Sequence, residues 1–117
     1  MTVQECYEAF GGNYAEVIGR LRTDERVTKF LMRIPGDACL ALLDESMKSR
    51  NMEEAFRAAH TLKGICMNLA ITKLLGSAEK LTEALRGRKE YGDDLVPLYE
   101  CVQKDLAQTV SCIQKLD

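Results

Sequence analysis

The residues best suited to chemistry lie in the segment Ala58–Gly64, which contains His60, the only histidine of the chain. Residues 51–71 around it have the spacing of an amphipathic helix. Because a helix turns about 100° per residue, His60 lies opposite the apolar side of this helix. That side is formed by Ala55, Ala58, Leu62, Ile65 and Leu69. The imidazole is therefore predicted to point away from the core, where a ring nitrogen with a free lone pair could act as a nucleophile without a general base.

Two residues on the same face fit a nucleophile that meets a large partner. Gly64 follows His60 by one turn, although glycine inside a helix costs roughly 0.5–1 kcal/mol relative to alanine. Because helical side chains lean over the turn on their N-terminal side, a glycine here leaves the imidazole uncovered. Lys63 adds a compact positive charge where an anion attached to His60 would lie. Together they indicate an accessible nucleophile with a counter-charge beside it.

The run from His60 to Gly64 resembles the His-x-Leu-Lys-Gly signature of histidine phosphotransfer (HPt) domains, and Asn68-Leu69 follow at a spacing seen in bacterial members. The chain as a whole resembles a bacterial HPt protein of the stand-alone type. The resemblance implies that His60 accepts a phosphoryl group from a receiver-domain aspartate of a response regulator and passes it to another receiver. It also implies that the domain has no kinase activity and no cofactor of its own, since the receiver brings Mg²⁺. A hybrid sensor kinase is a further partner that the resemblance implies.

Two positions depart from the family pattern. Met67 stands where such domains commonly carry a small residue, and Ala70 stands where they commonly carry a glycine. These departures leave an alternative function open, in which a helical adaptor docks a receiver domain or another signalling protein without being phosphorylated. An enzyme with its own catalytic centre is not indicated, because the chain has no paired-carboxylate, metal or nucleotide motif.

The face around His60 is predicted to be the docking surface. Phe56 and Met67 flank the imidazole, and an apolar patch around a polar centre is typical of protein interfaces. Arg57 lies one turn before His60, and Ile71 is expected to extend the patch, with Leu75 beyond it. We therefore expect Phe56, Arg57, Met67 and Ile71 to contact the receiver.

Composition restricts the other classes of function. The net charge is −2 and the cationic residues are scattered, which disfavours nucleic acid as a partner. Because the chain has neither an 18-residue apolar run nor a secretion signal, we expect a soluble, cytoplasmic monomer that does not bind membranes. The five cysteines are odd in number and widely spaced, so buried reduced thiols are favoured over disulfides or a metal site. We expect no bound metal.

Capping residues and apolar spacing predict helices throughout the chain and no strand. Thr2, Asn13 and Thr23 or Asp24 are expected to start three N-terminal segments, the third ending at Pro35-Gly36. Longer helices are expected to start at Asp37, Asn51, Thr72 and about Asp93. The predicted fold is all-α: one domain over residues 1–117, with short helices in 1–22 capping an antiparallel four-helix bundle within 23–117.

Overall fold

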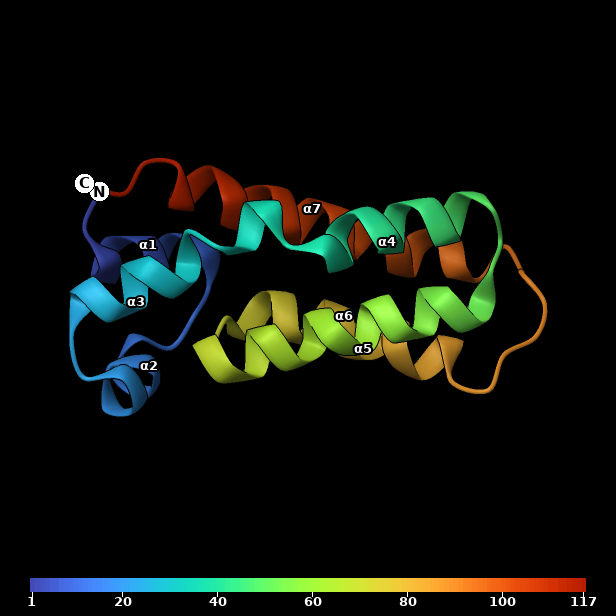
Figure 1. Cartoon of the computed structure of the whole chain (residues 1–117), viewed down its shortest axis with the longest axis horizontal. Helices are drawn as coiled ribbons and strands as arrows, with labels where there is room; N and C mark the ends of the chain where they lie inside the picture. The colour runs from blue at the N-terminus through green and yellow to red at the C-terminus, as the bar shows by residue number, and fades with distance from the viewer.

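The four longest helices of the chain run antiparallel along the length of the molecule. The structure is a computed structural model that describes all residues, 1–117. These helices are α4 (Ala38–Lys48), α5 (Met52–Leu69), α6 (Thr72–Leu85) and α7 (Leu95–Ile113), and short turns join the first three (Figure 1). The molecule measures 43 × 22 × 21 Å along its principal axes. The prediction of an all-α antiparallel bundle is confirmed.

Three short helices cover one end of this bundle: α1 (Val3–Phe10), α2 (Tyr14–Leu21) and α3 (Asp24–Leu31). The sequence predicted the first two in this place. The sequence pattern predicts that the third, α3, belongs to the bundle, which it places within residues 23–117, but α3 lies beside α1 and α2 at the same end (Figure 1). A short 3₁₀ helix, Ile34–Gly36, connects α3 to α4.

Side-chain caps set most helix starts where the sequence predicts them. Thr2 and Glu5 form a reciprocal capping box at the start of α1. The side chains that accept a hydrogen bond from the first turn of the next four α-helices are those of Asn13, Thr23, Asp37 and Asn51. Each cap satisfies one of the backbone N–H groups that a helix start leaves without a partner.

Two boundaries differ from the prediction. The third segment ends as an α-helix at Leu31 rather than at Ile34, because the ring of Pro35 would clash with the carbonyl of Leu31 if the α-helix continued. Thr72 does not cap α6: the capping position is Ile71, which makes no side-chain cap, while the Thr72 hydroxyl donates to the carbonyl of Ala70 at 3.4 Å.

The turn between α5 and α6 is held by the turn between α1 and α2. The hydroxyl of Tyr7 donates to the carbonyl of Leu69 at 2.7 Å, and the Asn13 N–H donates to the carbonyl of Ala70 at 2.9 Å. The Lys73 N–H donates to the carbonyl of Gly11, also at 2.9 Å. We call these three contacts the clasp. They fix the C-terminal end of α5 against the N-terminal helices.

Backbone conformation at the clasp explains two residue choices. Ala70 has φ of +53°, a left-handed conformation that glycine adopts at lower cost. Gly12 has no room for a side chain, since a Cβ there would lie 2.5 Å from the Tyr7 ring, 2.7 Å from Phe10 and 3.0 Å from the carbonyl oxygen of Ala70.

Four of the five cysteines are buried and reduced, as the sequence predicts, but Cys101 is exposed on α7. Burial raises the pKa of Cys39 and of Cys66 to about 12, and that of Cys6 to about 11. These three thiols therefore stay protonated at neutral pH and behave as small apolar side chains.

Gly12→Ala should lower the free energy of unfolding by about 2 kcal/mol, because the new methyl group has to push apart Tyr7 and the Ala70 backbone. Gly19 in α2 is the matched control: a Cβ there meets nothing within 4 Å. Gly19→Ala should raise the free energy of unfolding by roughly 0.5–1 kcal/mol. Chemical denaturation measures both, and equal effects of the two substitutions would contradict the steric account of the clasp.

Candidate functional site

His60 lies near the middle of α5, on the face that turns away from the bundle. Its side chain is exposed, whereas the residues on the opposite face of α5 are buried. That buried face consists of Met52, Ala55, Ala58, Ala59, Leu62, Cys66 and Leu69. The helical periodicity of the sequence therefore places the imidazole in solvent, as predicted, and an incoming group can reach it.

Gly64 leaves the space next to His60 open. A Cβ at this position would meet nothing within 4 Å. The glycine is therefore not required for close helix packing, which removes the simplest structural reason for having it inside α5. Its effect is to leave one turn of the helix surface bare beside the imidazole.

Phe56 holds the imidazole on its other side. The rings of Phe56 and His60 stack with 5.8 Å between centroids and 14° between planes. The guanidinium of Arg86, at the end of α6, lies over the Phe56 ring at 5.2 Å from its centroid. Phe56 is half-buried against the core, so its ring supports His60 from within the bundle while the imidazole stays exposed.

The positive charges near His60 differ in what they contact. Lys63 is half-buried and forms no ion pair, and it lies near enough to α6 to act on Glu83. A hydrogen bond from Arg86 holds the pKa of Glu83 below its ordinary value, and the charge of Lys63 acts in the same direction. Arg86 forms the ion pair with Glu83, at 3.0 Å, so Lys63 keeps an ammonium group that is not bound to a carboxylate.

Arg57 is exposed on the same face, but acidic residues on its own helix engage it. Its guanidinium lies 3.6 Å from the carboxylate of Glu53 and 3.3 Å from that of Glu54. Both carboxylates lie toward the start of α5, so they draw the charge away from His60. Arg57 is thus exposed for contact with a partner, but its charge is already paired. Lys63, which forms no ion pair, is the better candidate for stabilising negative charge next to the imidazole.

The expected apolar patch is smaller than predicted. Met67 is 50% exposed on the His60 face, as expected. Ile71 is fully buried, and the prediction that it extends the patch is wrong. It is wrong because α5 ends at Leu69 and the backbone reverses at Ala70, which turns the Ile71 side chain into the core. Leu75, on α6, is only half-buried.

Two arginines that the sequence did not single out also shape this region. Arg86 supports Phe56, and Arg20 of α2 donates to the carbonyls of Met67 and Asn68 at 2.6 and 3.1 Å. Arg20 thereby adds hydrogen bonds to carbonyl groups in the last turn of α5, where the Met67 carbonyl also accepts from the Ala70 N–H at 3.3 Å. Both contacts join residues distant in sequence, so no local pattern could have indicated them.

No group of three or more His, Cys, Asp or Glu side chains is placed to hold a metal ion. None of the helices combines the length and the apolar character that crossing a bilayer requires.

Comparison with protein families matches residues 31–112 to the Hpt domain. The chain belongs to the Hpt domain family. The match spans well over half of the chain: it begins at the last residue of α3, covers α4 to α6, and extends to Cys112 in α7. No curated protein and no solved structure matches the chain.

The Hpt family has a known general role. Hpt domains are phosphocarriers rather than kinases, they act in histidine phosphotransfer within phosphorelays, and they interact with receiver domains of response regulators. The only histidine of this Hpt domain lies within the matched residues, on the exposed face of α5.

The stacking of Phe56 on His60 can be tested by NMR, since a single histidine makes its ring signals unambiguous. Phe56→Leu keeps an apolar side chain in the core but removes the aromatic ring. The imidazole proton resonances should move downfield, because the ring current of Phe56 no longer shields them. Phe30→Leu, which alters a ring on α3, serves as the control and should leave these resonances in place.

Proposed function

We propose that this Hpt domain is an intermediate of a two-component phosphorelay in which His60 is the phosphoacceptor. The observation that carries the proposal is the exposed imidazole next to the open position of Gly64, on a helix whose other face is buried. A ring nitrogen of His60 attacks the phosphorus of an aspartyl phosphate on a receiver. The new P–N bond forms as the P–O bond to the aspartate breaks, and the aspartate leaves as a carboxylate.

The reverse step, with a second receiver, returns the phosphoryl group to an aspartate. Phosphoryl transfer passes through a loose transition state, so its rate depends on in-line placement and on charge stabilisation. This domain would contribute the nucleophile on a rigid helix, the ammonium group of Lys63 and the clearance at Gly64, while the receiver supplies Mg²⁺. Phe56, Arg57 and Met67 would contact the receiver around the imidazole.

The deciding experiment is transfer from a receiver that carries radiolabelled phosphate. The wild-type domain should take up label in a form that is lost in acid and kept in base, as expected for a phosphorylated imidazole. His60→Gln should take up none. If His60→Gln still binds the receiver and still supports signalling in cells, the domain is a helical adaptor and the proposal fails.

Lys63→Ala should slow transfer about tenfold, equivalent to roughly 1.4 kcal/mol of transition-state stabilisation, because the negative charge developing next to His60 loses a cation on the same helix that no carboxylate pairs. Lys80→Ala removes an exposed lysine from α6 and is the matched control. Far-UV circular dichroism should show that both variants stay folded. Single-turnover kinetics that gave the same rate for both variants would contradict the role of Lys63.

Gly64→Gln should reduce the rate of transfer at least ~10-fold, because its side chain occupies the approach to His60. Gly76, inside α6, is the matched control, because a Cβ there also meets nothing within 4 Å. Both substitutions replace a helical glycine and should raise the free energy of unfolding by roughly 0.5 kcal/mol. Unchanged transfer by Gly64→Gln would show that clearance is not the function of this glycine.

A further inference from the structure

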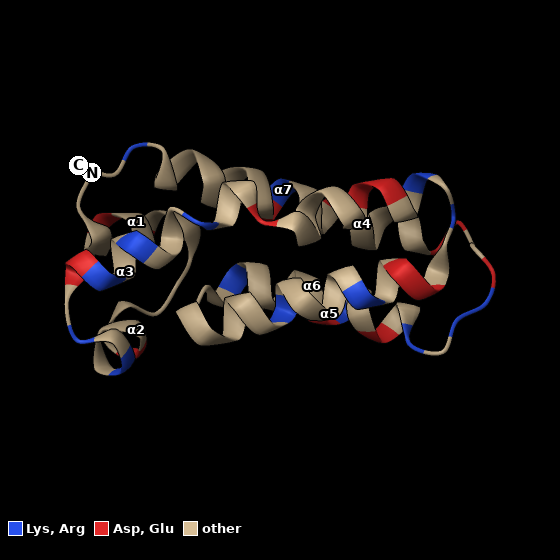
Figure 2. Ribbon diagram, in the orientation of Figure 1, with Lys and Arg blue, Asp and Glu red and all other residues tan.

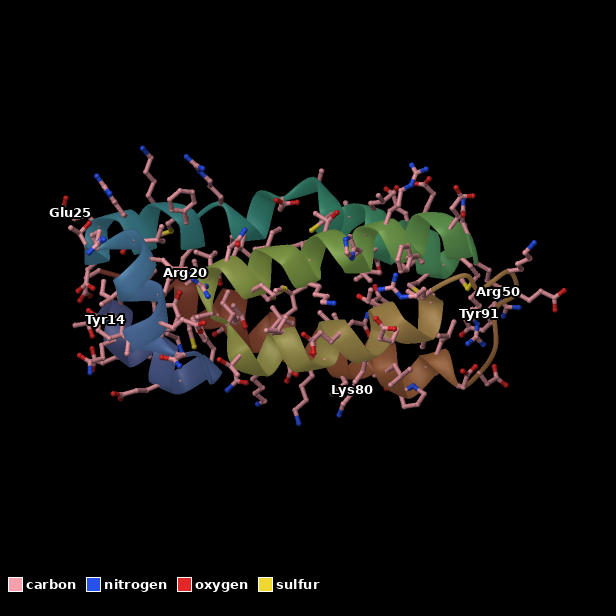
Figure 3. The ribbon with its side chains drawn as sticks, turned by 90° about the horizontal axis from the view of Figure 1, so that it is seen from below. Tyr14, Arg20, Glu25, Arg50, Lys80 and Tyr91 are labelled. Carbon is pink, nitrogen blue, oxygen red and sulfur yellow. The ribbon has the colours of Figure 1, made fainter.

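Three positive side chains form a stripe along α3 and the turn that follows it, outside the site around His60. Arg26, Lys29 and Arg33 follow one another at spacings of three and four, which places them on one face of the helical segment. All three are exposed, and no carboxylate of the chain forms an ion pair with any of them. Figure 3 shows nitrogen-tipped side chains that project from α3 away from the bundle. We call these three residues the basic stripe.

The positive charge of the basic stripe is opposite in sign to the net charge of the molecule. The chain carries −2, so the residues outside the stripe together carry −5. Lys and Arg elsewhere are interspersed with Asp and Glu on the helices, as Figure 2 shows. The negative charge of α3 itself lies at its start, where Asp24 accepts a hydrogen bond from the Tyr14 hydroxyl at 2.6 Å.

An apolar groove adjoins the basic stripe. It has a volume of about 410 Å³ and lies between the α2–α3 region and the C-terminal half of α5. Its apolar lining is formed by Leu21, Phe30, Ile34, Ile65 and Leu69. Phe30 is 38% exposed, an uncommon position for a large aromatic side chain on a protein surface.

Arg33 belongs to both features. It lines the groove, and its guanidinium lies 4.9 Å from the centroid of the Phe30 ring. Arg20, the other arginine of the groove, is already occupied by Glu16 and by the carbonyls of Met67 and Asn68. Arg33 is therefore the cation available to a molecule seated there. The groove is also lined by Asp37, whose carboxylate accepts a hydrogen bond from the Cys39 N–H at 2.9 Å.

We propose that the basic stripe and the groove form one docking surface for an acidic amphipathic helix of a partner protein. The apolar face of that helix would fill the groove, as in other helix-in-groove complexes, and its carboxylates would lie over Arg26, Lys29 and Arg33. Because the charged stripe adjoins the apolar groove, a ligand that covers the whole surface needs both acidic and apolar groups. An acidic amphipathic helix supplies both.

The same observations disfavour a polyanion such as nucleic acid or an anionic membrane. The stripe runs over the eight residues from Arg26 to Arg33, about 10 Å at the rise of a helix, which is short for a phosphate backbone. The remaining charge of −5 would repel an extended polyanion, and the exposed Phe30 would face phosphates with no apolar partner.

This docking surface is separate from the phosphoacceptor site but lies close to it. Ile65 and Asn68 line the groove and follow His60 by five and eight residues on α5, which is about 8 and about 12 Å along the helix axis. A partner held in the groove would therefore keep its other surfaces within reach of the His60 face. The binding itself does not depend on His60, so it can be tested whether or not the domain carries phosphate.

The test measures fluorescence anisotropy of a labelled peptide of about 14 residues, with leucines on one helical face and glutamates on the other. The wild-type domain should bind it, and raising the salt from about 0.05 to about 0.5 M should weaken binding at least ~5-fold. Replacing Arg26, Lys29 and Arg33 together by Gln should weaken binding at least ~10-fold. Phe30→Ala should weaken it ~5-fold or more through loss of the apolar anchor.

The matched control replaces Lys80, Lys89 and Lys104 by Gln, which removes three exposed lysines outside α3. This variant should bind the peptide within about twofold of the wild type. His60→Gln should bind it as the wild type does, which separates this inference from the proposed phosphotransfer. Circular dichroism checks that every variant is folded.

Three outcomes would overturn the proposal. The first is absence of saturable binding to the peptide, and the second is equal binding by the stripe variant and the lysine control. The third is tighter binding to an oligothymidylate of about 20 nucleotides, or to phosphatidylserine vesicles, than to the peptide, since it would assign the stripe to a polyanion.

Discussion

The burial of one face of α5 is the constraint on which the rest of the structure depends. Small side chains dominate that face, with Ala55, Ala58, Ala59 and Cys66 all at most 1% exposed, so α4 and α6 can approach the helix closely. Close packing on both sides leaves α5 no freedom to rotate about its axis. Since the buried face cannot turn, the opposite face keeps His60 and Gly64 toward solvent.

Packing against α4 and α6 prevents rotation of α5, and the clasp prevents movement of its C-terminal end. The clasp joins the α5–α6 turn to the α1–α2 turn through two backbone hydrogen bonds and the buried hydroxyl of Tyr7. Arg20 adds two hydrogen bonds to the last turn of α5. The N-terminal helices, although mostly outside the residues matched to the family, therefore help to position the helix that carries the proposed phosphoacceptor.

Local signals in the sequence were sufficient for most of the fold. Caps at Thr2, Asn13, Asp37 and Asn51 act within one turn, so sequence spacing alone could place them. The exposure of His60 and Met67 followed from helical periodicity. Helical periodicity misplaces Ile71, because α5 ends at Leu69 and the left-handed conformation of Ala70 changes the direction of the chain. The contacts of Arg20 and Arg86, and the groove beside α3, depend on segments that meet only in the folded bundle.

A single imidazole on a single open face has a kinetic consequence for the proposed relay. A donor and an acceptor receiver would both need the same ring from the same direction, so they cannot be bound there together. Each turnover would then require the first protein to leave before the second arrives, with the phosphate held in between only by the P–N bond. Throughput would be governed by dissociation rates, and tight binding to either receiver would slow signalling rather than improve it.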